Sequence, residues 1–211
     1  MIKRIIFDLD GTLIIPNYDK LGLFLKRLNN ELDEEFILNL NSYFKEFESF
    51  NDKYSYEKLF QFLKEKSDGK LNYNHFMKMI DYSSNIEEED FSEMIDMFRS
   101  ISKKYEIYVL TNWFKYVQIL KLKKAGIYEY IDKIVCGEEV LKPNEKAYKL
   151  CSKGLKKEEC LFVGDNYVND VISPIKLGYK AILFDKMGFS SQDKVYVLKN
   201  INYLVNYLEK I

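Results

Sequence analysis

Two carboxylates, one residue apart, follow the first apolar run of the chain. Asp8 and Asp10 come directly after Ile5-Ile6-Phe7, and Gly11 then lets the chain turn tightly. Removing a carboxylate from water is costly unless a cation or hydrogen-bond donors compensate. One interpretation is an ordinary turn at the end of a strand, which the pair Asp-Gly favours. The other is a cation site in which Asp8 is also a nucleophile. The motifs in the rest of the sequence are needed to distinguish these two interpretations.

Polar residues also follow three later apolar runs, at 107–110, 134–136 and 160–163. These residues are Thr111, Asn112, Lys142, Asp165 and Asp170. Each has a structural alternative: a helix cap at 111–112, a solvated loop lysine, and a turn after the third run. If the runs are parallel strands, however, their carboxyl ends emerge at one edge of the sheet. Because each of these polar residues follows a different predicted strand, their positions together favour one shared site.

The residue types at this expected edge suit metal-assisted phosphoryl chemistry. Hard oxygen ligands fit Mg²⁺, and the carboxylates of Asp8 and Asp165 with the backbone carbonyl of Asp10 could supply them. Phosphate esters repel a carboxylate, so the metal and Lys142 would have to offset that charge. Thr111 could donate a hydrogen bond to a phosphoryl oxygen.

The first two aspartates could carry the covalent step and the proton transfers. Aspartate is a nucleophile in known phosphoryl transfers, which is the role available to Asp8. Asp10 could protonate the leaving oxygen and then deprotonate the attacking water.

Strand-like runs alternate with helical spacing over most of the chain. Residues 5–7 form an apolar run without alternation, which is typical of a strand buried on both faces. Beyond residue 90, runs at 107–110, 134–136, 160–163 and 181–184 alternate with amphipathic segments. This alternation predicts right-handed crossovers and a parallel sheet. We therefore expect an α/β fold with a doubly wound, Rossmann-like parallel sheet.

A helical segment interrupts this alternation after the first run. Apolar residues at helical spacing form four sets between residues 21 and 80, and the second set runs as one segment from Phe36 to Phe50. Breaker residues at Pro16 and a polar acidic stretch at 85–90 indicate linkers on either side. These linkers give two predicted domains: a core of residues 1–15 and 86–211, and an all-helical domain of residues 16–85.

Composition limits the classes of partner. The 211 residues include 32 Lys plus Arg and 33 Asp plus Glu, a net charge of -1, which predicts no nucleic-acid partner and no attraction to an acidic membrane. We see no apolar stretch of bilayer-spanning or signal-peptide length. The sequence has an odd number of cysteines, at Cys136, Cys151 and Cys160, and no two of them are close enough for a CxxC pair. We therefore expect buried, reduced thiols. A soluble cytoplasmic protein is the resulting expectation.

The four polar motifs together resemble those of the haloacid dehalogenase-like (HAD) hydrolase superfamily. The matching residues, in order, are Asp8-Leu9-Asp10-Gly11-Thr12, Thr111-Asn112, Lys142-Pro143, and Gly164-Asp165 with Asp170. A single match would be weak, whereas four in order at strand ends form a specific signature. The resemblance extends from residue 1 to about residue 185.

This resemblance implies a role for each matched residue. Asp8 would be the nucleophile and Asp10 the acid/base, with Thr111, Asn112 and Lys142 binding the phosphoryl group. Asp165 would bind Mg²⁺, and Asp170 would bind it or orient its ligands. The helical segment would be a mobile cap that closes over the substrate, as in phosphoglycolate-phosphatase-like proteins.

The leading hypothesis is a Mg²⁺-dependent phosphatase that acts on a small phosphorylated metabolite through an aspartyl-phosphate. A phosphomutase would use the same motifs and stays open. A haloacid dehalogenase needs no second acid, so Asp10 argues against it. A non-catalytic binding protein on the same scaffold is disfavoured because every expected polar group is present. The sequence leaves the substrate and the oligomeric state open.

Overall fold

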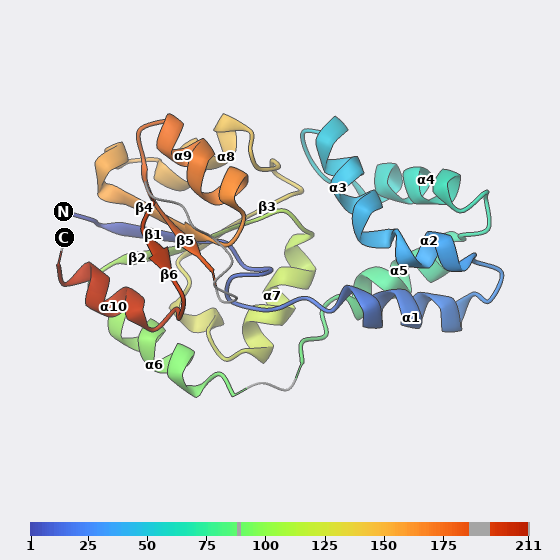
Figure 1. The fold of residues 1–211 in the computed structure, drawn as a ribbon, viewed down its shortest axis with the longest axis horizontal. Coiled ribbons are helices and arrows are strands. Elements are labelled where there is room, and N and C mark those ends of the chain that lie inside the picture. The colour runs from blue at the N-terminus through green and yellow to red at the C-terminus, as the bar shows by residue number, and fades with distance from the viewer. Residues whose placement is uncertain (88–89, 186–194, 211) are drawn as a thin grey trace.

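A parallel β-sheet forms the centre of the larger part of the molecule, and helices α1 to α5 (residues 18–82) form a separate group beside it (Figure 1). The computed structural model describes residues 1–87, 90–185 and 195–210. Within these ranges the sheet has six strands in the order β3-β2-β1-β4-β5-β6. The strands are β1 (Arg4–Phe7), β2 (Glu106–Thr111), β3 (Lys133–Cys136), β4 (Cys160–Gly164), β5 (Lys180–Phe184) and β6 (Val197–Leu198). The first strand is thus an inner strand, which confirms the prediction from its uniformly apolar sequence.

Helices cover both faces of the sheet. On one face, Ile5 and Phe7 pack in a core with α6 (Ser92–Ile101), α7 (Lys115–Lys124) and α10 (Tyr203–Leu208). On the other face, Ile6 packs with α8 (Glu145–Ser152), and α9 (Ser173–Lys176) lies on that side as well (Figure 1). Short helical turns are η1 (Tyr128–Tyr130), η2 (Lys157–Glu159) and the π-helical η3 (Tyr167–Ile172). The predicted doubly wound α/β fold is confirmed.

The register of the strand pairs brings the carboxyl ends of β1, β2 and β4 to one level. Phe7 on β1 is paired with Val109 on β2 and with Val163 on β4. Thr111 on β2 is in turn paired with Cys136 on β3. The residues that follow these positions therefore emerge together, as expected for parallel strands. None of the helices in the described ranges combines the length and the apolar character needed to cross a bilayer.

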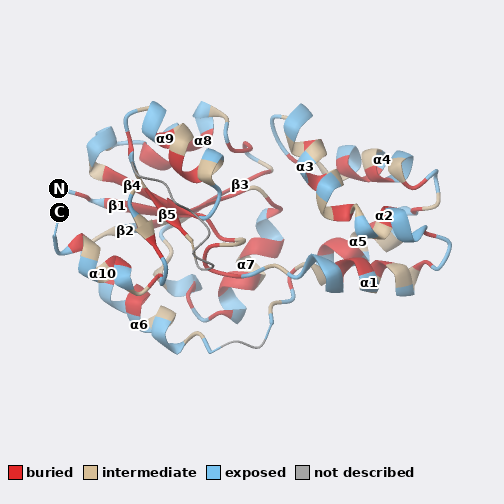
Figure 2. Cartoon of the chain, viewed as in Figure 1, coloured by how far each residue is buried: buried red, intermediate tan, exposed pale blue. Residues whose placement is uncertain are grey.

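The chain between β1 and β2 contains a group of helices that lies to one side of the sheet. They are α1 (Tyr18–Leu28), α2 (Glu34–Leu38), α3 (Leu40–Phe50), α4 (Tyr56–Lys66) and α5 (Tyr73–Tyr82). Their buried faces turn toward one another (Figure 2) and share a hydrophobic cluster that includes Leu25, Phe44 and Phe76. We call residues 16–85 the helical module.

The single helical segment predicted from Phe36 to Phe50 is wrong in two details. The chain forms two helices, α2 and α3, that meet at Asn39. The Asn39 side chain donates to the Glu35 carbonyl at 2.9 Å, and such local bonding competes with helix continuation. Phe50, placed in the apolar stripe by its spacing, is 78% exposed because α3 ends there.

The helical module contacts the core through backbone hydrogen bonds as well as side chains. The Tyr54 N–H donates to the Gly137 carbonyl at 2.7 Å, and the Leu141 N–H donates to the Asp52 carbonyl at 2.8 Å. Gly137 permits this approach, since a Cβ there would lie 2.6 Å from the Tyr54 ring. Four residues of the core also belong to the module's hydrophobic cluster: Trp113, Phe114, Val117 and Leu141. Separating the module from the core would therefore break both backbone bonds.

The three cysteines are free and buried, and burial raises the pKa of Cys136 and Cys151 to about 12 and that of Cys160 to about 11. Because the thiolate is the reactive form, we expect no labelling of native protein by a disulfide thiol reagent at neutral pH. All three thiols should react after denaturation in urea. Counting modified thiols before and after denaturation tests this, and rapid labelling of the native protein would contradict the burial.

Candidate active site

Asp8 begins the site at the end of β1. Its N–H donates to the Val163 carbonyl of β4 at 2.9 Å, which extends the sheet by one residue and fixes the direction of the side chain. Leu9 is fully buried and anchors the following turn. Gly11 has φ +98°, and a Cβ there would lie 2.5 Å from the Asp165 carboxylate. The turn after β1 thus needs a glycine both for its conformation and for its closeness to β4.

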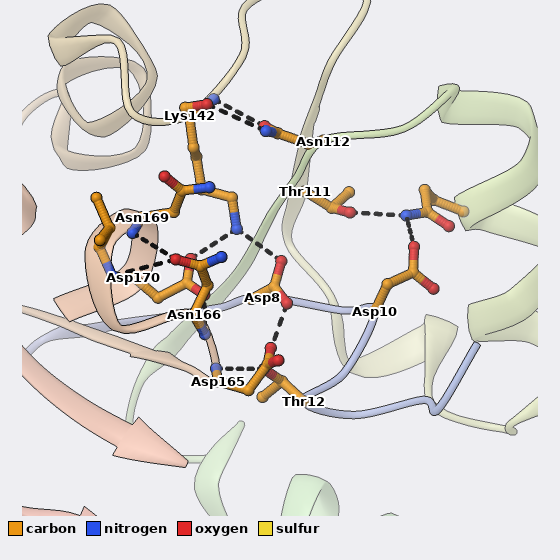
Figure 3. Close-up of polar contacts among 12 residues, drawn as sticks. Asp8, Asp10, Thr12, Thr111, Asn112, Lys142, Asp165, Asn166, Asn169 and Asp170 are labelled. Atoms are coloured by element: carbon orange, nitrogen blue, oxygen red, sulfur yellow. Dashed lines mark hydrogen bonds and ion pairs between the residues drawn. The ribbon is translucent and has the colours of Figure 1, made fainter. Parts of the chain in front are cut away.

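Lys142 reaches the site from the loop between β3 and α8. Its Nζ lies 2.6 Å from Oδ1 of Asp8 and 2.6 Å from Oδ1 of Asp170 (Figure 3). The side chain is only 5% exposed. Although burial lowers the pKa of Lys142, the negative charges of Asp170 and Asp8 raise it overall. The alternative of a solvated loop lysine is therefore wrong.

Three carboxylates gather where β1 and β4 end. Asp8, Asp165 and Asp170 each offer an oxygen within 4.8 Å of the others. Gly164 allows this, because a Cβ there would lie 2.4 Å from Asp170. Thr12 links two of them: its Oγ1 lies 3.0 Å from Oδ1 of Asp165 and 3.3 Å from Oδ2 of Asp8.

The charges of this cluster are not balanced by the protein alone. Burial raises the pKa of Asp8 well above its usual value, and Asp170 and Asp165 raise it further, although Lys142 opposes them. Burial and the charge of Asp170 likewise raise the pKa of Asp165. Three carboxylates facing the Lys142 ammonium leave an excess of negative charge. An oxygen-only donor set with this excess fits a hard divalent cation.

Thr111 and Asn112 stand at the end of β2 beside the same cluster. Asn112 accepts from the Lys142 N–H at 2.7 Å and donates to the Lys142 carbonyl at 3.1 Å. It does not cap α7, which begins at Lys115; that residue's N–H instead donates to the Glu138 carboxylate at 2.6 Å. The helix-cap interpretation is therefore wrong, and the Asn112 side chain holds the lysine loop.

The Asp10 carboxylate turns toward α7. Gln118 Nε2 donates to its Oδ2 at 2.6 Å, and Lys121 Nζ lies 2.6 Å from its Oδ1. Gln118 Nε2 also donates to the Thr111 hydroxyl at 2.6 Å. Sequence reasoning missed Gln118 and Lys121. The available signal was two polar residues on the buried face of a helix, beside Val117 and Leu122.

A cavity of about 810 Å³ lies over this cluster, between the sheet edge and the helical module. The seven residues predicted from the sequence all line it: Asp8, Asp10, Thr111, Asn112, Lys142, Asp165 and Asp170. The module adds aromatic side chains, including Tyr18 and Phe44, and the carboxylate of Glu48. Glu48 accepts from the Tyr54 hydroxyl at 2.8 Å and from the Asn112 amide at 3.2 Å. Burial raises the pKa of Glu48. Nothing in the sequence distinguished Glu48 from the solvent-exposed polar residues of an amphipathic helix.

The sequence that forms these strand ends matches a known protein family. The model of the family described as haloacid dehalogenase-like hydrolase matches residues 5–184, which run from β1 to the end of β5. The chain belongs to this family. The HAD match includes all four motif positions and the inserted helical module.

Curated relatives of this HAD protein match over part of their length. The glyceraldehyde 3-phosphate phosphatase of Methanothermobacter thermautotrophicus is 30% identical over 103 residues, which cover 47% of this chain and 45% of the relative. The pyrimidine 5'-nucleotidase YjjG of Escherichia coli is 32% identical over 89 residues, which cover 40% of each chain. The matched part is thus less than half the length of these relatives.

Solved HAD structures resemble the fold over nearly the whole chain. The HAD-hydrolase YfnB of Bacillus subtilis, determined bound to magnesium, aligns with a TM-score of 0.72 and 17% identity over 99% of both chains. The L-2-haloacid dehalogenase of Xanthobacter autotrophicus aligns with a TM-score of 0.78 and 13% identity over 100% of both chains. At these identities the likeness concerns the fold.

Proposed function

We propose that the protein is a Mg²⁺-dependent phosphatase that hydrolyses a small phosphomonoester through an aspartyl-phosphate at Asp8. The observation that carries this proposal is the buried contact of Lys142 with both Asp8 and Asp170 beside Asp165. A nucleophilic carboxylate, a fixed ammonium and an oxygen-rich cation site then lie together at one sheet edge. This is the combination that attack by a carboxylate on a phosphate ester needs.

Mg²⁺ would be held by the carboxylates of Asp8 and Asp165 and the backbone carbonyl of Asp10. Asp170 would hold it directly or orient its ligands, since its Oδ2 already accepts the Asn166 N–H at 3.0 Å. When bound, Mg²⁺ supplies positive charge that reduces repulsion between the phosphate ester and Asp8. Magnesium in the YfnB structure and the negative excess of this cluster support the choice.

The reaction would proceed in two balanced halves. First, an Asp8 oxygen bonds to phosphorus, the bond from phosphorus to the leaving oxygen breaks, and Asp10 gives its proton to that oxygen. Next, water attacks phosphorus, the bond to Asp8 breaks, and Asp10 takes the proton from water. Lys142 and the Thr111 hydroxyl would hold phosphoryl oxygens during both halves. Binding of the phosphoryl group by Asn112 stays a prediction, and its side chain supports the Lys142 loop.

The substrate would be a small phosphorylated metabolite that fits the cavity beneath the helical module. Residues 16–85 would act as a cap domain, and residues 1–15 and 86–211 as the core. The cavity of about 810 Å³ lies in the range typical of small-molecule sites. The curated relatives named as a phosphatase and a nucleotidase support a phosphomonoester as the substrate class.

A screen of phosphorylated metabolites tests this proposal. With Mg²⁺ present we expect release of inorganic phosphate from at least one small phosphomonoester. The release should stop when EDTA removes the metal and return when Mg²⁺ is added in excess. The Asp8→Asn protein serves as the blank for contaminating phosphatase. Conversion of a sugar phosphate to its isomer without phosphate release would indicate a mutase instead, and turnover that survives EDTA would contradict the metal dependence.

A further inference from the structure

The buried face of α7 carries two polar residues where a core helix would normally carry apolar ones. Gln118 is fully buried and Lys121 is 4% exposed. They lie three residues apart, so they share one side of the helix, next to buried Val117 and Leu122. Burying a lysine is strongly unfavourable unless an opposite charge meets it. The charge that meets Lys121 is the Asp10 carboxylate, at 2.6 Å.

Together the two side chains engage both oxygens of Asp10. Lys121 Nζ lies 2.6 Å from Oδ1, and Gln118 Nε2 lies 2.6 Å from Oδ2. A carboxylate held at both oxygens has little freedom to rotate. The orientation of the Gln118 amide follows from this contact, because only the NH₂ group of the amide can donate a hydrogen bond to Oδ2 of Asp10. The NH₂ group must therefore face Asp10.

Gln118 also reaches the hydroxyl that the proposed reaction uses. Its Nε2 lies 2.6 Å from the Thr111 Oγ1, so its two hydrogens can serve Asp10 and Thr111 at once. A Thr111 hydroxyl that accepts this bond keeps its own hydrogen for donation to a phosphoryl oxygen. The Gln118 Oε1 finds no partner among the residues that the structure describes. An unpaired buried oxygen is unfavourable, which argues against a purely structural glutamine.

We propose that Gln118 and Lys121 are positioning residues for proton transfer by Asp10. They hold its carboxyl group in one orientation relative to the leaving oxygen. Gln118 also bonds to the Thr111 hydroxyl, so the positions of Asp10 and Thr111 are fixed relative to each other. This inference rests on the proposed phosphatase activity. It concerns the step in which Asp10 gives its proton to the leaving oxygen.

Two aryl phosphates of similar shape separate this role from a structural one. Phenolate is a poor leaving group that needs a proton, whereas p-nitrophenolate leaves readily without one. In single-turnover assays we expect Lys121→Met to slow phenol release about 100-fold and p-nitrophenol release less than about fivefold. Gln118→Met should show the same selectivity, and Lys121→Arg should recover most of the phenol rate. Lys123→Met, an exposed position on the same helix, is the matched control and should change neither rate.

The outcomes distinguish this inference from the proposed function. If the variants lose both aryl activities equally, or lose neither, positioning of Asp10 by α7 is overturned while the phosphatase proposal stands. If the wild-type protein with Mg²⁺ releases neither phenol nor p-nitrophenol, and no metabolite in the screen loses phosphate, both are overturned. If Lys121→Met does not fold, Gln118→Met carries the same comparison.

Discussion

Asp8→Asn is expected to lower turnover of any phosphomonoester substrate by at least about 10⁴-fold, the scale of loss when the nucleophile of a covalent enzyme is removed. Asparagine has nearly the same shape, and its amide oxygen can still accept from Lys142, so the fold should persist. Its nitrogen cannot form the bond to phosphorus that the carboxylate oxygen forms. Steady-state assays of phosphate release, with circular dichroism as the check on folding, measure the effect.

Asp96→Asn gives a matched control for that substitution. Asp96 lies on α6 with a side chain that is 71% exposed, so the same chemical change there should leave turnover unaffected. A folded Asp8→Asn protein that keeps turnover within about tenfold of the wild type would exclude Asp8 as the nucleophile.

Lys142→Met is expected to have the second largest effect. The Lys142 ammonium is a positively charged donor for the negative phosphoryl group, and its removal should lower turnover by about 10²–10³-fold. It should also lower the free energy of unfolding by about 3–5 kcal/mol, because Asp8 and Asp170 lose the cation that both contact at 2.6 Å. Urea denaturation and phosphate-release assays measure the two effects. Lys146→Met, at an exposed position on α8, should show neither.

The loss of stability in Lys142→Met should depend on pH with a definite sign. Burial already raises the pKa of Asp8 in the folded protein, and removal of Lys142 takes away the charge that opposes this rise. A carboxyl group whose folded pKa lies above its unfolded value destabilises the fold when it is ionised and ceases to do so once it is protonated. The deficit should therefore be larger at neutral pH than at mildly acidic pH. A deficit that grows on acidification would contradict this account of the cluster.

The fold and the predicted site residues followed from local patterns in the sequence. Ile5, Ile6 and Phe7 indicated an inner strand, and strand–helix alternation indicated the parallel sheet, because burial on both faces leaves a characteristic apolar run. Once the strands were known to be parallel, the position of Asp165 after one of them sufficed to place it near Asp8. These inferences needed only the order of elements along the chain.

The contacts that the sequence did not reveal depend on how distant elements pack. Lys121 looks like a solvated helical lysine until α7 is placed with that side against Asp10. Glu48 belongs to the helical module, and its contact with Asn112 exists only because α3 packs over the end of β2. The break at Asn39 reflects a side-chain bond that competes with the helix, a balance that periodicity alone does not register.

The covalent intermediate is the most direct test of the whole account. Protein mixed with its substrate and Mg²⁺ can be quenched in acid within one turnover and digested, and the peptides can be mapped by mass spectrometry. We expect phosphate on the peptide that contains Asp8, attached to that side chain, and none in the Asp8→Asn protein. Phosphate attached to another residue during productive turnover, or rapid hydrolysis with no phosphorylated protein at any quench time, would contradict the central role of Asp8.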